Sequence, residues 1–216
     1  MPGPSGTNAG DIRANTASVP VLDCAEPLVS IASLAPGVLL DCRSPFLRLS
    51  AAERLTAAQN ALTIRAPDVR IRVGEAYRDP EHQRTVFRKV RLLVRVLRPF
   101  WSSSQVNETA ARYAADPDGD VPPPHGTGGA VDVGLVDKMG RRLYMGPFRL
   151  RAARIDCTAI SRVASANRAL LSEAMSAVGF INYPEEWWHW SYGDTEWAVH
   201  SGAPAAIYGP IDPPSL

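Results

Sequence analysis

Residues 125–136 read HGTGGAVDVGLV and join a glycine-rich turn to a strand of alternating pattern. Apolar residues dominate from Ala130 to Val136, and Asp132 lies among them. A carboxylate in such a strand needs a strong partner, because an unpaired buried charge is very unfavourable. His125 precedes it by seven residues, and the glycines between them let the backbone pack closely around a site. The sequence therefore predicts a strand that carries a carboxylate in need of a partner.

Helices and strands are predicted on both sides of this strand, and their interleaving indicates an α+β domain. Val69–Val73 alternates apolar and basic residues, as a half-buried strand does. Ser50 and Glu53 have capping-box spacing before a helix over about residues 51–63. Four more elements are predicted: a helix from the Asp79-Pro80 cap to about Leu97, a capped helix from near Asn107, a helix from about Ser161 to Val178 ended by Gly179, and a strand-like aromatic segment at 185–192.

Composition narrows the class of protein. The chain has 216 residues, 45% of them hydrophobic and 21% charged, which is typical of a folded domain and not of a disordered one. Its net charge of +1 indicates no general attraction to nucleic acid or to anionic lipid, and no apolar run is long enough to span a membrane. We expect a disordered arm over residues 1–20 and a single domain over residues 21–216.

The three cysteines predict free thiols. Their number is odd, their spacing is wide and no CxxC pair occurs, so neither a disulfide framework nor a cysteine-rich zinc site is indicated. The first twenty residues lack the basic start and apolar run of a secretory signal, and we expect a cytoplasmic protein. The cysteines are Cys24, Cys42 and Cys157.

The predicted helix at 80–97 carries a stripe of basic residues. Its apolar side is expected to be buried, and the stripe is either a binding face for phosphates or an acidic partner, or a solvated surface. We favour the solvated surface, because no exposed aromatic residues alternate with the arginines. The stripe consists of Arg84, Arg88, Arg91, Arg95 and Arg98, and the apolar side of Phe87, Val90, Val94 and Leu97.

Two histidines and two carboxylates form the candidate site. His125, His189 and Asp132 make a plausible set of three zinc ligands with a fourth position open to water, which is typical of catalytic zinc. Glu186 precedes His189 by three residues, so a turn or bulge must bring both side chains to one site. Each residue also has a plain interpretation: a packed histidine beside tryptophan, a surface glutamate, or an aspartate that caps a turn. Spacing alone leaves both interpretations open.

The two motifs together, HxxGxAxD at 125–132 and ExxH at 186–189, resemble those of the D-alanyl-D-alanine metallopeptidases, and most of all the dipeptidase branch. The resemblance extends over about residues 40–210 and includes Ala76-Tyr77-Arg78 and EWWHWSYGD at 186–194. It implies a hedgehog-like α+β fold, with an antiparallel sheet flanked by helices, and one Zn²⁺ ion per chain. It implies that His125, Asp132 and His189 are the zinc ligands, Glu186 the catalytic acid/base and Arg78 the group that stabilises the oxyanion.

Substrate contacts are expected at Tyr77, Trp188 and Arg149, although aromatic residues such as Trp188 are as often plain core. The chain departs from the family pattern at two positions, 123 and 149. Pro123 stands where family members have a substrate-binding serine, and Arg149 stands where the dipeptidase branch has an acidic residue that receives the substrate amine. Arg149 either attracts an anionic group instead or simply faces water.

The expected activity is zinc-dependent hydrolysis of a short peptide containing D-amino acids, with D-alanyl-D-alanine as the first candidate. One alternative is a D,D-carboxypeptidase that acts on a longer or N-blocked peptide. Another is a zinc-bearing binding module without catalysis, against which the presence of Glu186 argues, since a purely structural zinc needs no general base. The expected partner is a small peptide substrate, with neither nucleic acid nor membrane, and the sequence leaves the oligomeric state open.

Overall fold

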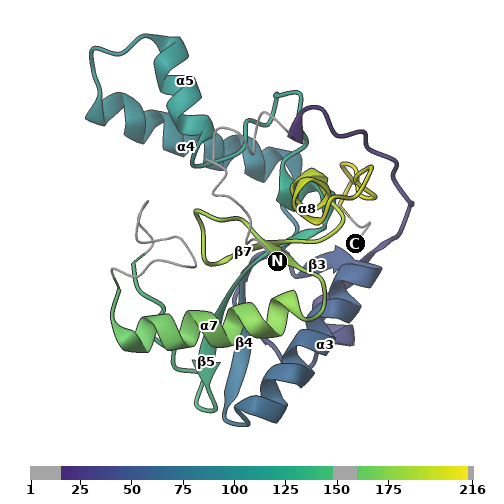
Figure 1. The fold of residues 1–216 in the computed structure, drawn as a ribbon. Helices are drawn as coiled ribbons and strands as arrows, with labels where there is room; N and C mark the ends of the chain where they lie inside the picture. The colour runs from purple at the N-terminus through teal and green to yellow at the C-terminus, as the bar shows by residue number, and fades with distance from the viewer. Residues whose placement is uncertain (1–15, 148–159, 214–216) are drawn as a thin grey trace.

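The computed structural model describes residues 16–147 and 160–213. Their centre is a five-stranded sheet in the order β2-β4-β5-β7-β6, and a two-stranded sheet β1-β3 lies beside it (Figure 1). The strands are β1 (Leu28–Ser30), β2 (Leu39–Leu40), β3 (Phe46–Arg48), β4 (Val69–Glu75), β5 (Ala130–Asp137), β6 (Ile181–Asn182) and β7 (His189–Ser191). The helices are α2 (Ile31–Leu34), α3 (Leu49–Arg65), α4 (Pro80–Leu97), α5 (Ser103–Ala111), η1 (Pro124–Thr127), α7 (Arg162–Ser176) and α8 (Thr195–Ser201).

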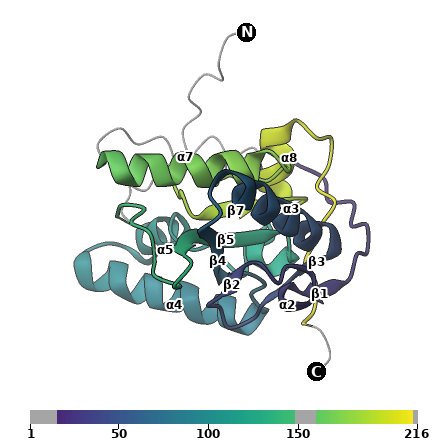
Figure 2. The ribbon, with the colours of Figure 1, turned by 90° about the horizontal axis from the view of Figure 1, so that it is seen from below.

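The expected α+β fold is confirmed, with one difference in the sheet. Every pairing in the main sheet is antiparallel except that of edge strand β2, which runs parallel to β4. Helices α3 and α7 contact each other and the sheet. Figure 2 shows the strands of the sheet between α7 and α4, so helices flank it as predicted.

Strand β5 separates the core from the functional face. Val131, Val133 and Leu135 belong to the main hydrophobic cluster, together with residues of α3 and α7. Side chains alternate along a strand, so the side chain of Asp132 points to the opposite face. Asp132 lies directly opposite His189 of β7 and opposite Glu75 of β4, where a bulge shifts the register. The pairing therefore aligns three ionisable residues in one row across three strands.

Two predicted caps are confirmed and two are wrong. The carboxylate of Asp79 accepts a hydrogen bond from the His82 N–H at the start of α4. Gly179 closes the end of α7 with φ +88°, and its N–H donates to the Ser176 carbonyl. The helix expected near Asn107 instead starts at Ser103, because Ser102 and Gln105 form a reciprocal capping box. Ser50 lies inside α3 and does not cap it: its hydroxyl donates to Glu26.

Arg48 holds the start of α3 in place through contacts from distant parts of the chain. Its side chain is almost fully buried, Nε donates to the Thr127 carbonyl and Nη2 pairs with Asp23 at 2.6 Å. Nη2 also donates to the Gly209 carbonyl. This side chain therefore ties both end segments of the described chain to the loop that carries His125.

Two glycines beside His125 are required by geometry. Gly128 ends η1 with φ +73°, in the left-handed region that disfavours side chains. A Cβ atom on Gly129 would lie 2.3 Å from the Tyr192 carbonyl oxygen, so only glycine allows this approach between the loop and the segment after β7. The close packing expected from the glycine-rich turn is thus present.

The part of the predicted arm that the structure describes is packed against the domain. Thr16 is buried, and the carbonyl of Pro20 accepts a hydrogen bond from the Ala206 N–H. Cys24 and Cys42 are free thiols, as predicted, while Cys157 lies outside the described residues. Among the described helices none has the length and apolar character needed to cross a bilayer.

Candidate active site

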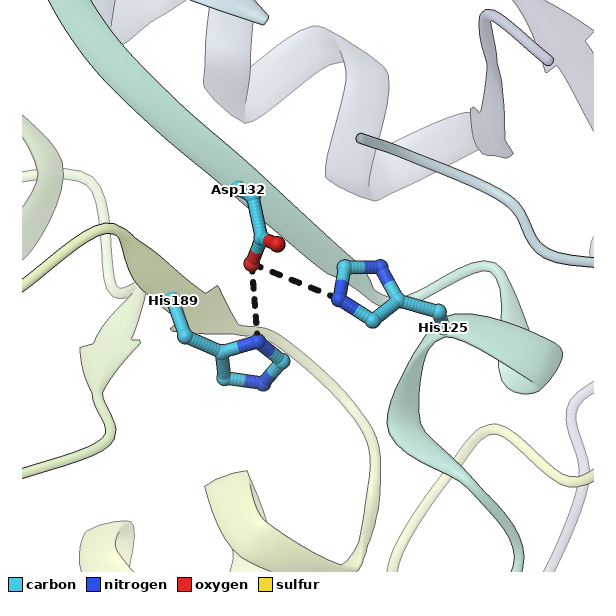
Figure 3. A group of neighbouring side chains, drawn as sticks. All are labelled: His125, Asp132 and His189. Atoms are coloured by element: carbon cyan, nitrogen blue, oxygen red, sulfur yellow. Dashed lines mark hydrogen bonds and ion pairs between the residues drawn. The ribbon is translucent and has the colours of Figure 1, made fainter. Parts of the chain in front are cut away.

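The three predicted metal ligands converge from three elements of the fold. His125 comes from η1, Asp132 from β5 and His189 from β7, and their ligand atoms all lie within 4.8 Å of one another (Figure 3). Oδ1 of Asp132 is 3.3 Å from Nε2 of His125 and 3.0 Å from Nδ1 of His189. Both histidines are buried. Residues 57 positions apart in the chain meet here because Asp132 and His189 are direct partners in the sheet.

These three side chains fit a zinc ion. Zinc in proteins prefers four tetrahedral ligands at roughly 2.0–2.1 Å, which places neighbouring ligand atoms roughly 3.3–3.4 Å apart. The observed separations of 3.0 and 3.3 Å are close to that spacing. Two imidazoles and one carboxylate also leave one of four positions for water or substrate. The geometry therefore matches an open, catalytic type of metal site.

The outer contacts of each histidine determine which nitrogen faces the site. Nδ1 of His125 donates to the Ala76 carbonyl at 2.8 Å, because a carbonyl can only accept, and this leaves the lone pair of Nε2 for a metal. Nε2 of His189 lies 3.5 Å from Oε2 of Glu196 and 3.4 Å from Oγ of Ser191, while Nδ1 points inward. Each ring is therefore oriented from outside.

The electrostatics of the group follow from burial and from opposite charges. Burial acts to raise the pKa of Asp132, but the two histidines outweigh it and hold that pKa far below its usual value. Burial lowers the pKa of His125 in spite of Asp132. Burial also acts to lower the pKa of His189, but hydrogen bonds with Asp132 and Glu196 raise it well above the usual value. Asp132 is thus a carboxylate at neutral pH, as a metal ligand must be.

Glu186 is brought to the site by a turn, as its spacing from His189 required. Its N–H donates to the Tyr183 carbonyl and its own carbonyl accepts from the His189 N–H, each at 3.0 Å. The side-chain amide of Asn182 donates to the carbonyls of Glu186 and His189 and fixes the turn from inside. Glu186 therefore lines the same cavity as the three candidate ligands.

That cavity has a volume of about 180 Å³ and contains several of the predicted functional side chains. Arg78 enters it from the end of β4, where Nη1 donates to Gln83 at 2.9 Å and Nη2 pairs with Glu75 at 3.3 Å. The ion pair with Glu75 therefore holds the guanidinium of Arg78 at the wall of the site. Trp188 and Pro123 also line the cavity.

Tyr77, one of the predicted substrate contacts, does not line this cavity. Tyr77 is buried, and its hydroxyl donates to the Ile211 carbonyl at 2.7 Å, an arrangement that supports the chain behind the site. Burial raises the pKa of Tyr77 to about 12. Arg149 lies outside the described residues. Trp187 and Trp190 are buried, the second wholly in the core.

Glu196 is a candidate site residue that the sequence pattern did not identify. It lies in the first turn of α8, capped by Asp194, and lines the cavity beside His189. Burial and the nearby Glu196 raise the pKa of Asp194 to about 6, so the two acids together crowd negative charge behind His189. In the sequence, Asp194 and Glu196 follow His189 by five and seven residues, but the ExxH motif ends at His189 and does not include them.

Replacing Glu196 by glutamine should weaken zinc binding by about tenfold to a hundredfold, the range seen when outer partners of metal-bound histidines are changed. The physical reason is that a neutral amide no longer fixes the proton on Nε2 of His189. Competition with a chromophoric chelator measures the affinity. Glu173→Gln, which removes an exposed partner of Arg65, is the matched control. Equal affinities for wild type and Glu196→Gln would show that Glu196 does not position the histidine.

A family model described as D-ala-D-ala dipeptidase matches residues 51–203, a range that includes His125, Asp132, Glu186 and His189. The D-alanyl-D-alanine dipeptidase of Synechocystis sp. is 29% identical, over 84% of this chain and 87% of that protein.

Two solved structures share the fold. VanYB, in complex with D-alanine-D-alanine, has 20% identity and a TM-score of 0.50, over 82% of this chain and 84% of that one. The LdcB LD-carboxypeptidase has 18% identity and a TM-score of 0.50, over 85% of this chain and 77% of that one. At such identities the likeness indicates a common architecture.

Proposed function

Since the chain belongs to the D-ala-D-ala dipeptidase family and is a metallopeptidase, we propose that it hydrolyses D-alanyl-D-alanine with one zinc ion held by His125, Asp132 and His189. The observation that carries the proposal is the convergence of these three side chains, at separations suited to tetrahedral zinc, in a cavity that Glu186 and Arg78 also line. The Synechocystis relative bears the name of the same activity.

The residues around the metal position have distinct tasks. A bound zinc ion supplies Lewis-acid chemistry, which makes water more acidic and polarises a carbonyl group. Glu186 takes the proton from the attacking water and then gives it to the leaving amine. Arg78 donates hydrogen bonds to the carbonyl oxygen as that oxygen becomes negative. Nε of Arg78 is buried and has no hydrogen-bond partner among residues 16–147 and 160–213, so it is a donor suited to that task.

One observation favours a second candidate, a D,D-carboxypeptidase acting on an N-blocked peptide. A further cavity of about 350 Å³ shares Asp132 and Trp188 with the first and continues to Arg72 and Arg142. Both guanidinium groups contact one oxygen of Asp41, at 2.6 and 2.9 Å, so two positive charges meet one negative charge. This end of the groove therefore suits an acidic group on the substrate, in the way considered for Arg149.

Product analysis on paired substrates separates the candidates. We expect zinc-loaded protein to cleave free D-alanyl-D-alanine. Because a dipeptidase site is shaped for a free dipeptide, its kcat/KM should be at least about tenfold above that for N-acetylated D-alanyl-D-alanine. The Glu186→Ala variant is the blank. Preference for the blocked peptide, increased further when an N-succinyl group replaces N-acetyl, would instead support the carboxypeptidase and its Arg72–Arg142 contact. If one zinc ion is bound and neither substrate is cut, the proposed substrate class is wrong.

A further inference from the structure

Helices α4 and α5 form a hairpin that projects from the rest of the molecule (Figure 1). An exposed apolar stripe runs along α4 to the turn of this hairpin. We call it the hairpin stripe. Its four helical members have 58–68% of their surface exposed, and Phe100 at the turn is 99% exposed. The hairpin stripe consists of Leu92, Leu93, Val96, Leu97 and Phe100.

The hairpin stripe is a second apolar face of α4. The inner face packs on α5 through Phe87 and Ala110, in a small cluster of its own. Residues 92, 93, 96 and 97 recur at the spacing of neighbours on a helix surface, so they form one continuous strip. Leu97, which was expected on the buried side, is therefore an exposed residue. A merely solvated helix face does not explain such a strip, since large contiguous exposed apolar patches usually mark interaction surfaces.

Positive charge surrounds this strip without compensation. No aspartate or glutamate occurs from residue 82 to residue 107, a segment that contains five arginines and a lysine. Lys89 lies three residues before Leu92 and four before Leu93, which places it on the same face of the helix as the strip. Arg88, Lys89, Arg91 and Arg98 are exposed, and no acidic side chain of the described residues pairs with them. The net charge of +1 for the whole chain conceals this local concentration.

The turn of the hairpin adds aromatic residues at its tip. Phe100 is exposed there, and Arg98 lies over the Trp101 ring at 5.3 Å. Aromatic and leucine side chains next to lysine and arginine characterise helices that lie in the interface of an anionic bilayer. The apolar side chains enter the acyl boundary, while the long basic side chains reach the head groups.

We propose that the α4–α5 hairpin binds the surface of an anionic lipid bilayer through the hairpin stripe and its neighbouring cations. A second copy of this chain is a poorer occupant, because pairing two stripes would bring two unpaired cation clusters together. A bilayer rich in anionic head groups supplies the opposite charge as well as the apolar phase. This proposal goes beyond the peptidase activity and does not rest on it, and it revises the expectation of no membrane partner that the overall charge gave.

Sedimentation with vesicles tests the proposal on the full chain. We expect the protein to bind vesicles that contain phosphatidylglycerol, to bind them less as salt rises, and to bind pure phosphatidylcholine weakly. The Leu93→Ser/Leu97→Ser/Phe100→Ser variant should lose at least about tenfold in partition coefficient, because three inserted side chains become polar. Ile64→Ser is the control, since Ile64 is an apolar residue 85% exposed on α3, away from the hairpin.

A variant that removes positive charge separates the electrostatic contribution to vesicle binding from the apolar one. Arg88→Gln/Lys89→Gln/Arg91→Gln should reduce binding to anionic vesicles, while Lys138→Gln, in an exposed ion pair with Asp68, should not. Peptide hydrolysis in solution should be unchanged in all of these variants. Failure of the wild type to bind anionic vesicles would overturn the proposal. So would a dimer in sedimentation velocity that the triple serine variant dissociates, because the stripe would then be an interface between two copies.

Discussion

Replacing Glu186 by glutamine should lower kcat by about a hundredfold to ten-thousandfold, the contribution typical of a positioned general acid–base group. Glutamine keeps the size of the side chain and the turn that Tyr183 and Asn182 stabilise, but it cannot accept and return a proton. Zinc content should stay at that of wild type, because Glu186 is not among the three converging ligands. Steady-state kinetics on the best substrate, with metal analysis of the same samples, measures both.

Glu185→Gln is the matched control for this experiment. Glu185 precedes Glu186 in the same turn and does not line the cavity, so its loss should leave kcat close to that of wild type. A Glu186→Gln enzyme that retains more than about a tenth of wild-type kcat would contradict the assigned role, since general acid–base catalysis contributes more than that. The same result would point to a different proton carrier in the cavity.

Replacing Asp132 by alanine should weaken zinc binding by more than about a hundredfold, beyond the effect of any outer contact. The substitution removes one of three ligands and also the oxygen that both histidine nitrogens approach. Hydrolysis should fall in proportion to the loss of bound zinc. Chelator competition gives the affinity, and activity titrated with added zinc shows whether high metal concentration restores turnover.

Asp137→Asn tests whether this effect is specific. Asp137 lies on the same strand, at its far end, and pairs with exposed Arg141. Zinc affinity should be unchanged in Asp137→Asn. The circular dichroism spectra of Asp137→Asn and Asp132→Ala should match, which would show that both variants fold in the same way. If Asp132→Ala kept wild-type affinity, the metal would have to be held elsewhere and the three-ligand site would be incorrect.

Local signals predicted most of the helices and strands, and distant contacts explain the errors. Asp79-Pro80 starts α4 as expected, because a cap and a first-turn proline act within one turn of helix. Ser50 has equally good local spacing, yet its hydroxyl is taken by Glu26, which lies 24 residues away. Leu97 followed the pattern of the buried face, but none of the described elements covers it and it is 65% exposed. Such outcomes depend on partners that a local pattern does not contain.

Most residues of the candidate site were also predicted from local patterns, and the residues that were missed depend on distant contacts. His125, Asp132, Glu186 and His189 carry recognisable spacings, and the structure places all four at one cavity. Glu75 and Glu196 were not identified. The first reaches the site through the shifted register between β4 and β5, and the second through the return of α8 behind His189. Neither the register shift nor the helix docking has a sequence signature of its own.

Arg48 has a consequence for how the molecule opens. The segments before β1 and after α8 are joined by the contact between Val21 and Ala206, and Arg48 binds both of them as well as the loop at Thr127. The N–H of Ile211 also donates to the Gly126 carbonyl, beside His125. Cooperative units of a protein open together when their hydrogen bonds are shared. We therefore expect undocking of either end segment and displacement of the loop that carries His125 to occur as one event.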